Sequence, residues 1–340
     1  MDTMITGAVF VQTNDAAANQ VVAFRRGADG TLAALGTYET GGRGNGVPHL
    51  PSQGSLAVAG RHLLVTNAGS DDVSVFTIGM DGLTFVDRAP AGTSPRSVAF
   101  HDGLVYVLGT GGITGLHLGV DGKLTQIAGS ARPLSADEAD GAQIAFSPNG
   151  ATVVVTERVT DRITTYAVEE DGLLDGPVAH PSAGVTPYGF DFGPNGVLVV
   201  TEAFGGQAGA AAASSYRLNG APEIVPVSAS VRNTRSEVCW AAVTKDGRHA
   251  YVTNFGDNTI SSYRIGADGS LELLDAVAAS TRRGEKGIRD EALTADGRFL
   301  YALDADAQTI HGWTVAADGE LVPAGTADGL PATVAGLAAI

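Results

Sequence analysis

One turn recurs along this chain of 340 residues, and it constrains the fold more than any other feature. The segments "GADGTLAAL", "GADGSLELL" and "AADGELVPA" each place Asp-Gly between two apolar runs. This is the strongest short signal for a β-hairpin, because the central residues of the favoured tight turn need positive φ, which glycine adopts without strain. The signal recurs at intervals of 40 to 52 residues. Its seven copies are Asp29-Gly30, Asp81-Gly82, Asp121-Gly122, Asp171-Gly172, Asn219-Gly220, Asp268-Gly269 and Asp318-Gly319.

A period of this length is typical of a solenoid, a propeller or an array of repeats. Each turn follows a strand such as "DVSVFTI" or "NTISSYRI". Upstream of that strand lies a hairpin of two apolar runs, as in "QIAFSPNGATVVVTE", so each repeat holds four short strands. Four strands in roughly 40–50 residues make one blade of a β-propeller. The sequence therefore predicts an all-β, seven-bladed β-propeller with four-stranded blades.

The two ends of the sequence predict how the ring closes. The chain begins with a run that matches the second strand of a blade, "ITGAVFVQTN", and ends with one that matches a first strand, "TVAGLAAI". We therefore expect the C-terminal strand to join the N-terminal blade. Because such a closure ties all the repeats into one body, we predict a single propeller domain over residues 1–340.

Composition restricts the partners and the compartment. The formal net charge of −16 argues against nucleic acid, whose binding rests on cationic contacts to phosphate. No segment resembles a signal peptide, and no apolar run is long enough to span a bilayer. The one cysteine, Cys239, has no internal disulfide partner, which favours a reducing compartment. We expect a cytoplasmic protein that acts on a small-molecule substrate and binds neither nucleic acid nor membrane.

Several motifs resemble those of the lactonase-type seven-bladed β-propellers, relatives of 6-phosphogluconolactonase and carboxymuconate cyclase. They are "FSPNG", "VTNAGSDDVSVF" and "GADGSL", and the likeness extends over the whole chain. The resemblance implies a lactonase-like propeller. Family members usually begin inner strands with Pro-Arg-His, which would supply substrate-handling Arg and His, whereas "SPRSVAF" keeps Pro95 and Arg96 but has Ser97 for the histidine. Because this fold carries many unrelated activities, the function has to be argued from the site.

Blade topology predicts where a site assembles. The links from second to third strands, and from each fourth strand to the next blade, meet on one face around the mouth of the central channel. The starts of the inner strands and the ends of the second strands should form two rings of side chains there. The substrate-binding candidates from these rings, with one histidine from an interblade link, are His49, Gln53, Asn67, Gln143, Tyr188, Trp240, Asn254, Arg289 and Asp290.

Hydrolysis of a lactone requires a base that activates water and a donor that stabilises the developing oxyanion. Glu202 is the predicted base, with Glu157 as the alternative. Arg96 is the predicted anchor for the oxyanion or for a substrate carboxylate. The competing interpretation is structural, because strand ends such as "VTE" can simply pair with neighbouring backbone. Tyr188 and Trp240 offer an aromatic wall for a small ring, or else they pack between blades.

Motifs for metals and cofactors do not occur in the sequence. It contains no H-E-x-x-H, Cys-x-x-Cys or EF-hand spacing, and "GGRGNG" matches neither phosphate-loop pattern. We therefore expect no cofactor and no metal at the site. Three functions remain open: a lactonase-like hydrolase, which we favour, a cycloisomerase or lyase at the same mouth, and a non-catalytic propeller that binds a ligand or protein.

Overall fold

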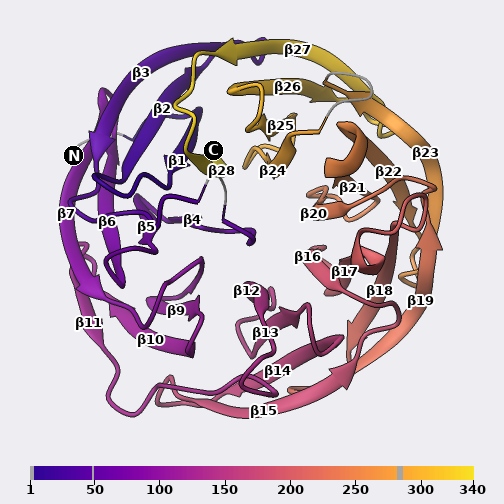
Figure 1. The fold of residues 1–340 in the computed structure, drawn as a ribbon, viewed down its shortest axis with the longest axis horizontal. Coiled ribbons are helices and arrows are strands. Elements are labelled where there is room, and N and C mark those ends of the chain that lie inside the picture. The colour runs from indigo at the N-terminus through magenta and orange to yellow at the C-terminus, as the bar shows by residue number, and fades with distance from the viewer. Residues whose placement is uncertain (1–3, 48–49, 282–285) are drawn as a thin grey trace.

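The computed structural model describes residues 4–47, 50–281 and 286–340. Seven four-stranded antiparallel sheets surround a central channel, with the first strand of each sheet nearest the channel and the fourth at the rim (Figure 1). The predicted all-β, seven-bladed propeller is confirmed.

In each blade the strands follow the chain outwards, except in blade I, whose innermost strand comes from the C terminus. Blade I contains β28 (Val334–Ala339), β1 (Ala8–Thr13), β2 (Gln20–Arg26) and β3 (Leu32–Glu39). Blade II contains β4 (Leu56–Ala59), β5 (His62–Asn67), β6 (Asp72–Gly79) and β7 (Gly82–Pro90). Blade III contains β8 (Ser97–His101), β9 (Leu104–Gly109), β10 (Gly112–Leu118) and β11 (Leu124–Gln126). Blade IV contains β12 (Gly141–Phe146), β13 (Thr152–Glu157), β14 (Arg162–Val168) and β15 (Leu174–Pro181).

The last three blades follow the same order, and two short 3₁₀ helices follow second strands. Blade V contains β16 (Pro187–Phe192), β17 (Val197–Glu202), η1 (Phe204–Gly206), β18 (Ala212–Leu218) and β19 (Ile224–Arg232). Blade VI contains β20 (Val238–Val243), β21 (His249–Asn254), η2 (Phe255–Asp257), β22 (Thr259–Ile265) and β23 (Leu271–Ser280). Blade VII contains β24 (Ile288–Leu293), β25 (Phe299–Asp304), β26 (Thr309–Val315) and β27 (Leu321–Asp328). Within the described residues, neither helix is long and apolar enough to cross a membrane.

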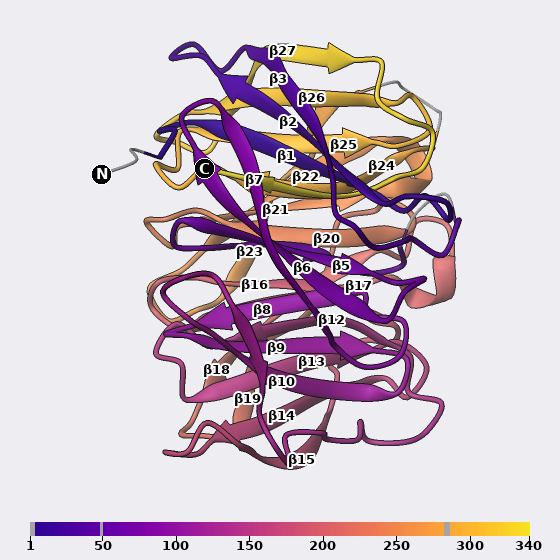
Figure 2. The ribbon, with the colours of Figure 1, turned by 90° about the vertical axis from the view of Figure 1, so that its left-hand side faces the viewer.

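The ring closes as the sequence predicts. β28 pairs antiparallel with β1, with Leu337 opposite Val11. Val334 and Leu337 enter the apolar core between blades VII and I, while Ile340 enters the core between blades I and II. The C-terminal end therefore lies beside the N-terminal blade in both views of the molecule (Figures 1 and 2).

The second strands show why the sequence carries long apolar runs. In β5, β13, β17 and β21 every position is buried. A strand that packs against neighbouring blades on both faces needs apolar side chains on both, so its sequence does not alternate. The fourth strands at the rim have one face in solvent and contain many exposed residues.

The Asp-Gly turns differ in one respect from the predicted tight turn, in which both central residues have positive φ. Gly30 has φ 87°, but Asp29 is not among the residues with positive φ. The Asp29 carboxylate instead accepts hydrogen bonds from the N–H and the hydroxyl of Thr31, at 3.1 and 2.7 Å. The aspartate therefore caps a wider turn with its side chain, a role that Asp fills in many turns.

At three of the turns the glycine also joins two blades. The Tyr301 hydroxyl of blade VII donates to the Gly30 carbonyl of blade I at 2.6 Å. A Cβ at position 30 would lie 2.5 Å from Phe299, so glycine is required both for φ and for this close approach. Equivalent hydrogen bonds join Tyr106 to Gly172 at 2.6 Å and Tyr251 to Gly319 at 2.9 Å.

Candidate active site at the channel mouth

The predicted base Glu202, at the end of β17, lies inside its blade and is fully buried. Its Oε1 accepts hydrogen bonds from the Gly184 N–H at 2.8 Å and the Ser214 hydroxyl at 2.5 Å, and its Oε2 accepts one from Ser230 at 2.6 Å. Burial raises the pKa of Glu202, while these donors lower it. The contacts favour a structural role, and the role as general base stays a prediction.

Glu157, the alternative base, has the same kind of environment at the end of β13. It is fully buried and accepts hydrogen bonds from the Ser135 N–H at 2.9 Å and from the hydroxyls of Thr160 and Thr164, both at 2.7 Å. The Ser135 hydroxyl donates to it as well. The carboxylate therefore holds the surrounding strands and link together and does not face the mouth.

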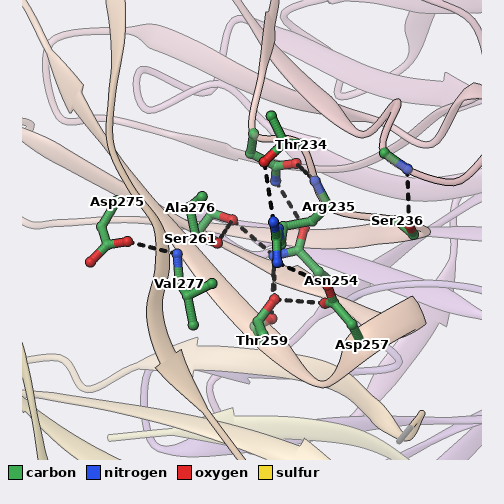
Figure 3. Close-up of polar contacts among 12 residues, drawn as sticks. Thr234, Arg235, Ser236, Asn254, Asp257, Thr259, Ser261, Asp275, Ala276 and Val277 are labelled. Carbon is green, nitrogen blue, oxygen red and sulfur yellow. Dashed lines mark hydrogen bonds and ion pairs between the residues drawn. The ribbon is translucent and has the colours of Figure 1, made fainter. Parts of the chain in front are cut away.

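Asn67 and Asn254, two predicted binding residues, end the second strands of blades II and VI and are also fully buried. The Asn254 amide donates to the hydroxyls of Thr259 and Ser261, at 3.1 and 2.9 Å (Figure 3). The Asn67 amide donates to the hydroxyl of Ser74 at 2.8 Å, which is the equivalent position seven residues further along the chain. In both blades the asparagine amide connects the second strand to the third strand, so these amides have a structural role within the blade.

Arg96 and Tyr188 are brought together at the mouth by two residues that the sequence analysis did not select. Oδ1 of Asp140 accepts a hydrogen bond from Arg96 at 2.8 Å, and its Oδ2 accepts one from Arg158. Arg158 donates in turn to the Tyr188 hydroxyl at 2.9 Å, and its guanidinium lies 4.9 Å from the centre of the Tyr188 ring. Asp140 therefore holds two guanidinium groups in place. The Arg96 guanidinium is hydrogen-bonded to this carboxylate and is not directed into an open cavity.

Tyr188 and Trp240 pack against each other, and their use as an aromatic wall for a substrate stays a prediction. The rings of Tyr188 and Trp240 lie 4.8 Å apart, and the buried Trp240 Nε1–H has no hydrogen-bond partner in the described part of the chain. Burial raises the pKa of Tyr188 to about 12, so its hydroxyl stays protonated. Burial likewise raises the pKa of Cys239 to about 12, which leaves a neutral thiol and argues against a nucleophile there.

Arg289, another predicted binding residue, lines the same cavity as Tyr188 and Cys239. Its guanidinium stacks on Phe255, 4.2 Å from the ring centre, and lies 3.7 Å from Asp306. Burial lowers the pKa of Arg289 from its very high ordinary value, and its Nε has no partner among the described residues. Nearby, Lys286 forms an ion pair with Glu237 at 2.5 Å.

Some of these groups line a cavity of about 440 Å³, whereas Arg96, Arg158 and Trp240 do not. Two of the lining residues, Thr186 and Glu237, have φ of 56° and 52°, and Asp140 has φ of 53° at the equivalent position of blade IV. Strained backbone of this kind clusters at functional sites. The cavity is lined among others by Thr186, Tyr188, Glu237, Cys239, Phe255 and Arg289.

Three predicted binding residues hold the inner strands of the channel. The Gln53 amide reaches across the channel and donates to the Ala241 carbonyl of blade VI at 2.9 Å. The Gln143 amide donates to the Phe190 carbonyl of blade V at 2.8 Å. Asp290 accepts a hydrogen bond from the backbone of β28 at 3.1 Å, and burial raises its pKa to about 8. Their use as substrate ligands stays untested.

Three charged residues of the mouth are absent from the sequence-based candidates. Asp140 and Glu237 come directly before the inner strands β12 and β20, and Arg158 comes directly after the second strand β13. Their charge is the sequence signal that could have identified them, because each stands close in sequence to one of the two predicted rings. His49 lies outside the described residues.

Four cationic side chains at the mouth are each ion-paired with a carboxylate. A guanidinium or ammonium group beside a recess stabilises negative charge that develops on a bound molecule. The cations are Arg96, Arg158, Lys286 and Arg289, and the carboxylates are Asp140, Glu237 and Asp306.

Known proteins share this architecture. The sequence matches the family described as "Lactonase, 7-bladed beta-propeller" over residues 56–221 and 201–333. A protein from Bacteroides uniformis, provisionally named a 6-phosphogluconolactonase, is 17% identical, with a TM-score of 0.74 over 98% of this chain and 99% of that chain. A periplasmic gluconolactonase from Pseudomonas aeruginosa is 17% identical, with a TM-score of 0.73 over 98% and 99% of the two chains. At this identity the structural likeness shows the fold alone.

A comparison with curated proteins by sequence finds no match. The family match nevertheless spans most of the chain, and the propeller accounts for all of its described strands. The chain therefore belongs to the lactonase family of seven-bladed β-propellers.

Proposed function

We propose that the protein hydrolyses a small lactone in the cavity at its channel mouth. The observation that carries the proposal is the pair of guanidinium groups, Arg158 and Arg289, beside Tyr188. Each has a buried Nε–H without a partner among the described residues, next to a cavity that also holds the Glu237 carboxylate. A base and a cationic oxyanion donor at one cavity are the two groups that ester hydrolysis requires.

In this proposal Glu237 removes a proton from water as the water oxygen attacks the lactone carbonyl. The carbonyl π electrons move to oxygen, and Arg289 stabilises the resulting oxyanion. The ring C–O bond then breaks, and the proton on Glu237 passes to the leaving ring oxygen, which yields a hydroxy acid. Lys286, 2.5 Å from Glu237, holds the carboxylate of this base in place.

Glu237 and Arg289 take over the roles that the sequence analysis predicted for Glu202 and Arg96. The reason is access, because Glu202 is fully buried and Arg96 is engaged by Asp140. Asp140 acts as a positioning residue that keeps Arg158 against Tyr188.

The test is a screen of lactones and unsaturated dicarboxylates, followed by proton release in a pH-stat. On a substrate found this way, Glu237→Gln and Arg289→Ala should each lower kcat roughly a hundredfold or more, as for other general-base and oxyanion groups. Arg264→Ala is the matched control, since Arg264 is ion-paired with Glu272 at 3.1 Å and exposed on β22. It should leave the rate unchanged.

Full activity in both mouth variants would show that these residues do not perform the chemistry. Consumption of a substrate without release of a proton would replace hydrolysis by a cycloisomerase or lyase reaction. Binding of a ligand without turnover of any compound would favour a non-catalytic propeller.

A further inference from the structure

A second cavity lies within the central channel, apart from the mouth. It measures about 250 Å³ and is lined by the inner strands of several blades. Gln53 and Gln143 line it as well, and their side-chain amides are hydrogen-bonded to the backbone of β20 and β16. These two amides therefore have few hydrogen-bonding groups left for a bound molecule.

Three carboxyl groups line this cavity together with one ammonium group. Asp191 of β16 accepts hydrogen bonds from the N–H groups of Phe192 and Val243, at 2.8 and 2.7 Å. Asp290 of β24 accepts hydrogen bonds from the backbone of its neighbour at 2.9 Å and of β28 at 3.1 Å. Lys245, just after β20, is exposed at the cavity rim.

Glu291 of β24 provides the third carboxyl group, which is buried and, within the described residues, unpaired. It is 2% exposed, and neither of its oxygens has a hydrogen-bond partner in the described part of the chain. Burial, Asp290 and Asp191 all raise its pKa well above the ordinary value. Buried polar groups are nearly always paired, and an unpaired buried carboxylate is strongly destabilising. Because Glu291 lines the cavity, a group bound in the cavity can supply the missing partner.

We propose that the channel cavity binds one divalent metal cation, with the Glu291 carboxylate as its direct ligand. Binding of the cation displaces the protons that the buried carboxyls otherwise hold, because metal ligands must be deprotonated. Three carboxylates and one ammonium then leave two negative charges, which one divalent cation cancels. Ions of this class take oxygen ligands, and carboxylates are their usual protein ligands. The site is separate from the mouth, and it stands whether or not the mouth hydrolyses lactones.

The cation keeps part of its hydration shell. No three Asp, Glu, His or Cys side chains of the described residues come close enough to enclose a bare ion. The cavity of about 250 Å³ has room for roughly eight waters at about 30 Å³ each, enough for a hydrated ion. Magnesium commonly binds in this way, through one or two carboxylates and several waters. Asp191 and Asp290 would contact the ion through such waters.

The test uses full-length protein stripped with EDTA and transferred to metal-free buffer at pH 8. Manganese serves as the probe, and loss of the free-ion electron paramagnetic resonance signal counts the bound ions. We expect one site per chain, from which magnesium or calcium displaces manganese and sodium does not. Glu291→Gln should weaken binding at least tenfold, because the amide is neutral.

Two further variants keep the result interpretable. Glu170→Gln removes the same charge from an exposed acidic turn of blade IV and should leave the site intact, which controls for weak binding to an acidic surface. Asp191→Asn should weaken binding if Glu291→Gln does not fold. The proposal is overturned if wild-type protein binds no stoichiometric manganese, or if Glu291→Gln and Asp191→Asn bind it like wild type. Either result would mean that the channel carboxyl groups are protonated and hydrogen-bonded to water, without a bound cation.

Discussion

Removal of the closing strand should unfold the ring, because β28 supplies the only innermost strand of blade I. Deletion of Thr333 to Ile340 takes Val334, Leu337 and Ile340 out of two apolar cores. At about 1.5–3 kcal/mol for each buried aliphatic side chain, the loss is about 5–9 kcal/mol. Proteins are stable by only about 5–15 kcal/mol, so this single strand accounts for a large part of the total.

The deletion also exposes the edge of β1, whose six residues are all buried in the intact ring. Unpaired apolar strand edges promote aggregation, so we expect soluble aggregates in size-exclusion chromatography and no cooperative thermal transition. Leu337→Ala is a graded version and should cost about 2–5 kcal/mol in urea denaturation. Val322→Ala in the exposed part of β27 is the control and should change stability little. A truncated chain that melts cooperatively within a few degrees of the full-length protein would refute the reasoning.

Two other predictions concern the channel and the turns. In EDTA, the melting temperature should fall between about pH 4 and pH 8, because burial raises the pKa of Asp191 to about 6 and of Asp290 to about 8, from an ordinary value of about 4 in the unfolded chain. The folded state then binds protons that the unfolded state has released, so this stability is lost as pH rises through the folded values. Asp290→Asn should flatten the upper part of the decline, and an unchanged profile would contradict the assignment. Separately, Gly30→Ala should destabilise the protein by about 1–3 kcal/mol more than Gly220→Ala in urea denaturation, because it adds an overpacked contact. Both glycines have positive φ, of 87° and 83°, but only Gly30 would press a Cβ against Phe299, and equal losses would show that the contact with blade VII is unimportant.

The fold was predictable because its signals are local and repeated. The seven Asp-Gly and Asn-Gly turns mark every third-to-fourth hairpin, and the unmatched strands at the two ends predict the shared blade. The turn type was predicted wrongly, but the predicted number of strands is correct, because Asp29 and Gly30 still reverse the chain at the expected place.

The site was less predictable because irregular pairing redirects side chains where the inner strands begin. The register shifts between Gly141 and Gln143, between Val238 and Ala241, and between Ile288 and Glu291. Each irregularity breaks the two-residue alternation, so counting along the strand no longer says which side chain faces the mouth. At the ends of the second strands the polar residues look accessible in sequence, yet in the structure their side chains are hydrogen-bonded within the blades.

The hydrogen bonds from tyrosine to turn glycine have a consequence for how such proteins diversify. They lie at the hairpins between third and fourth strands, whereas the mouth is built from links on the other face. A link such as the exposed stretch of residues 205–208 can therefore change in length or composition without disturbing the contacts that hold the blades together. Selection for a new substrate would act on one face while folding depends on the other. For protein engineers, the mouth links are accordingly the segments to randomise, and the turns are the segments to leave intact.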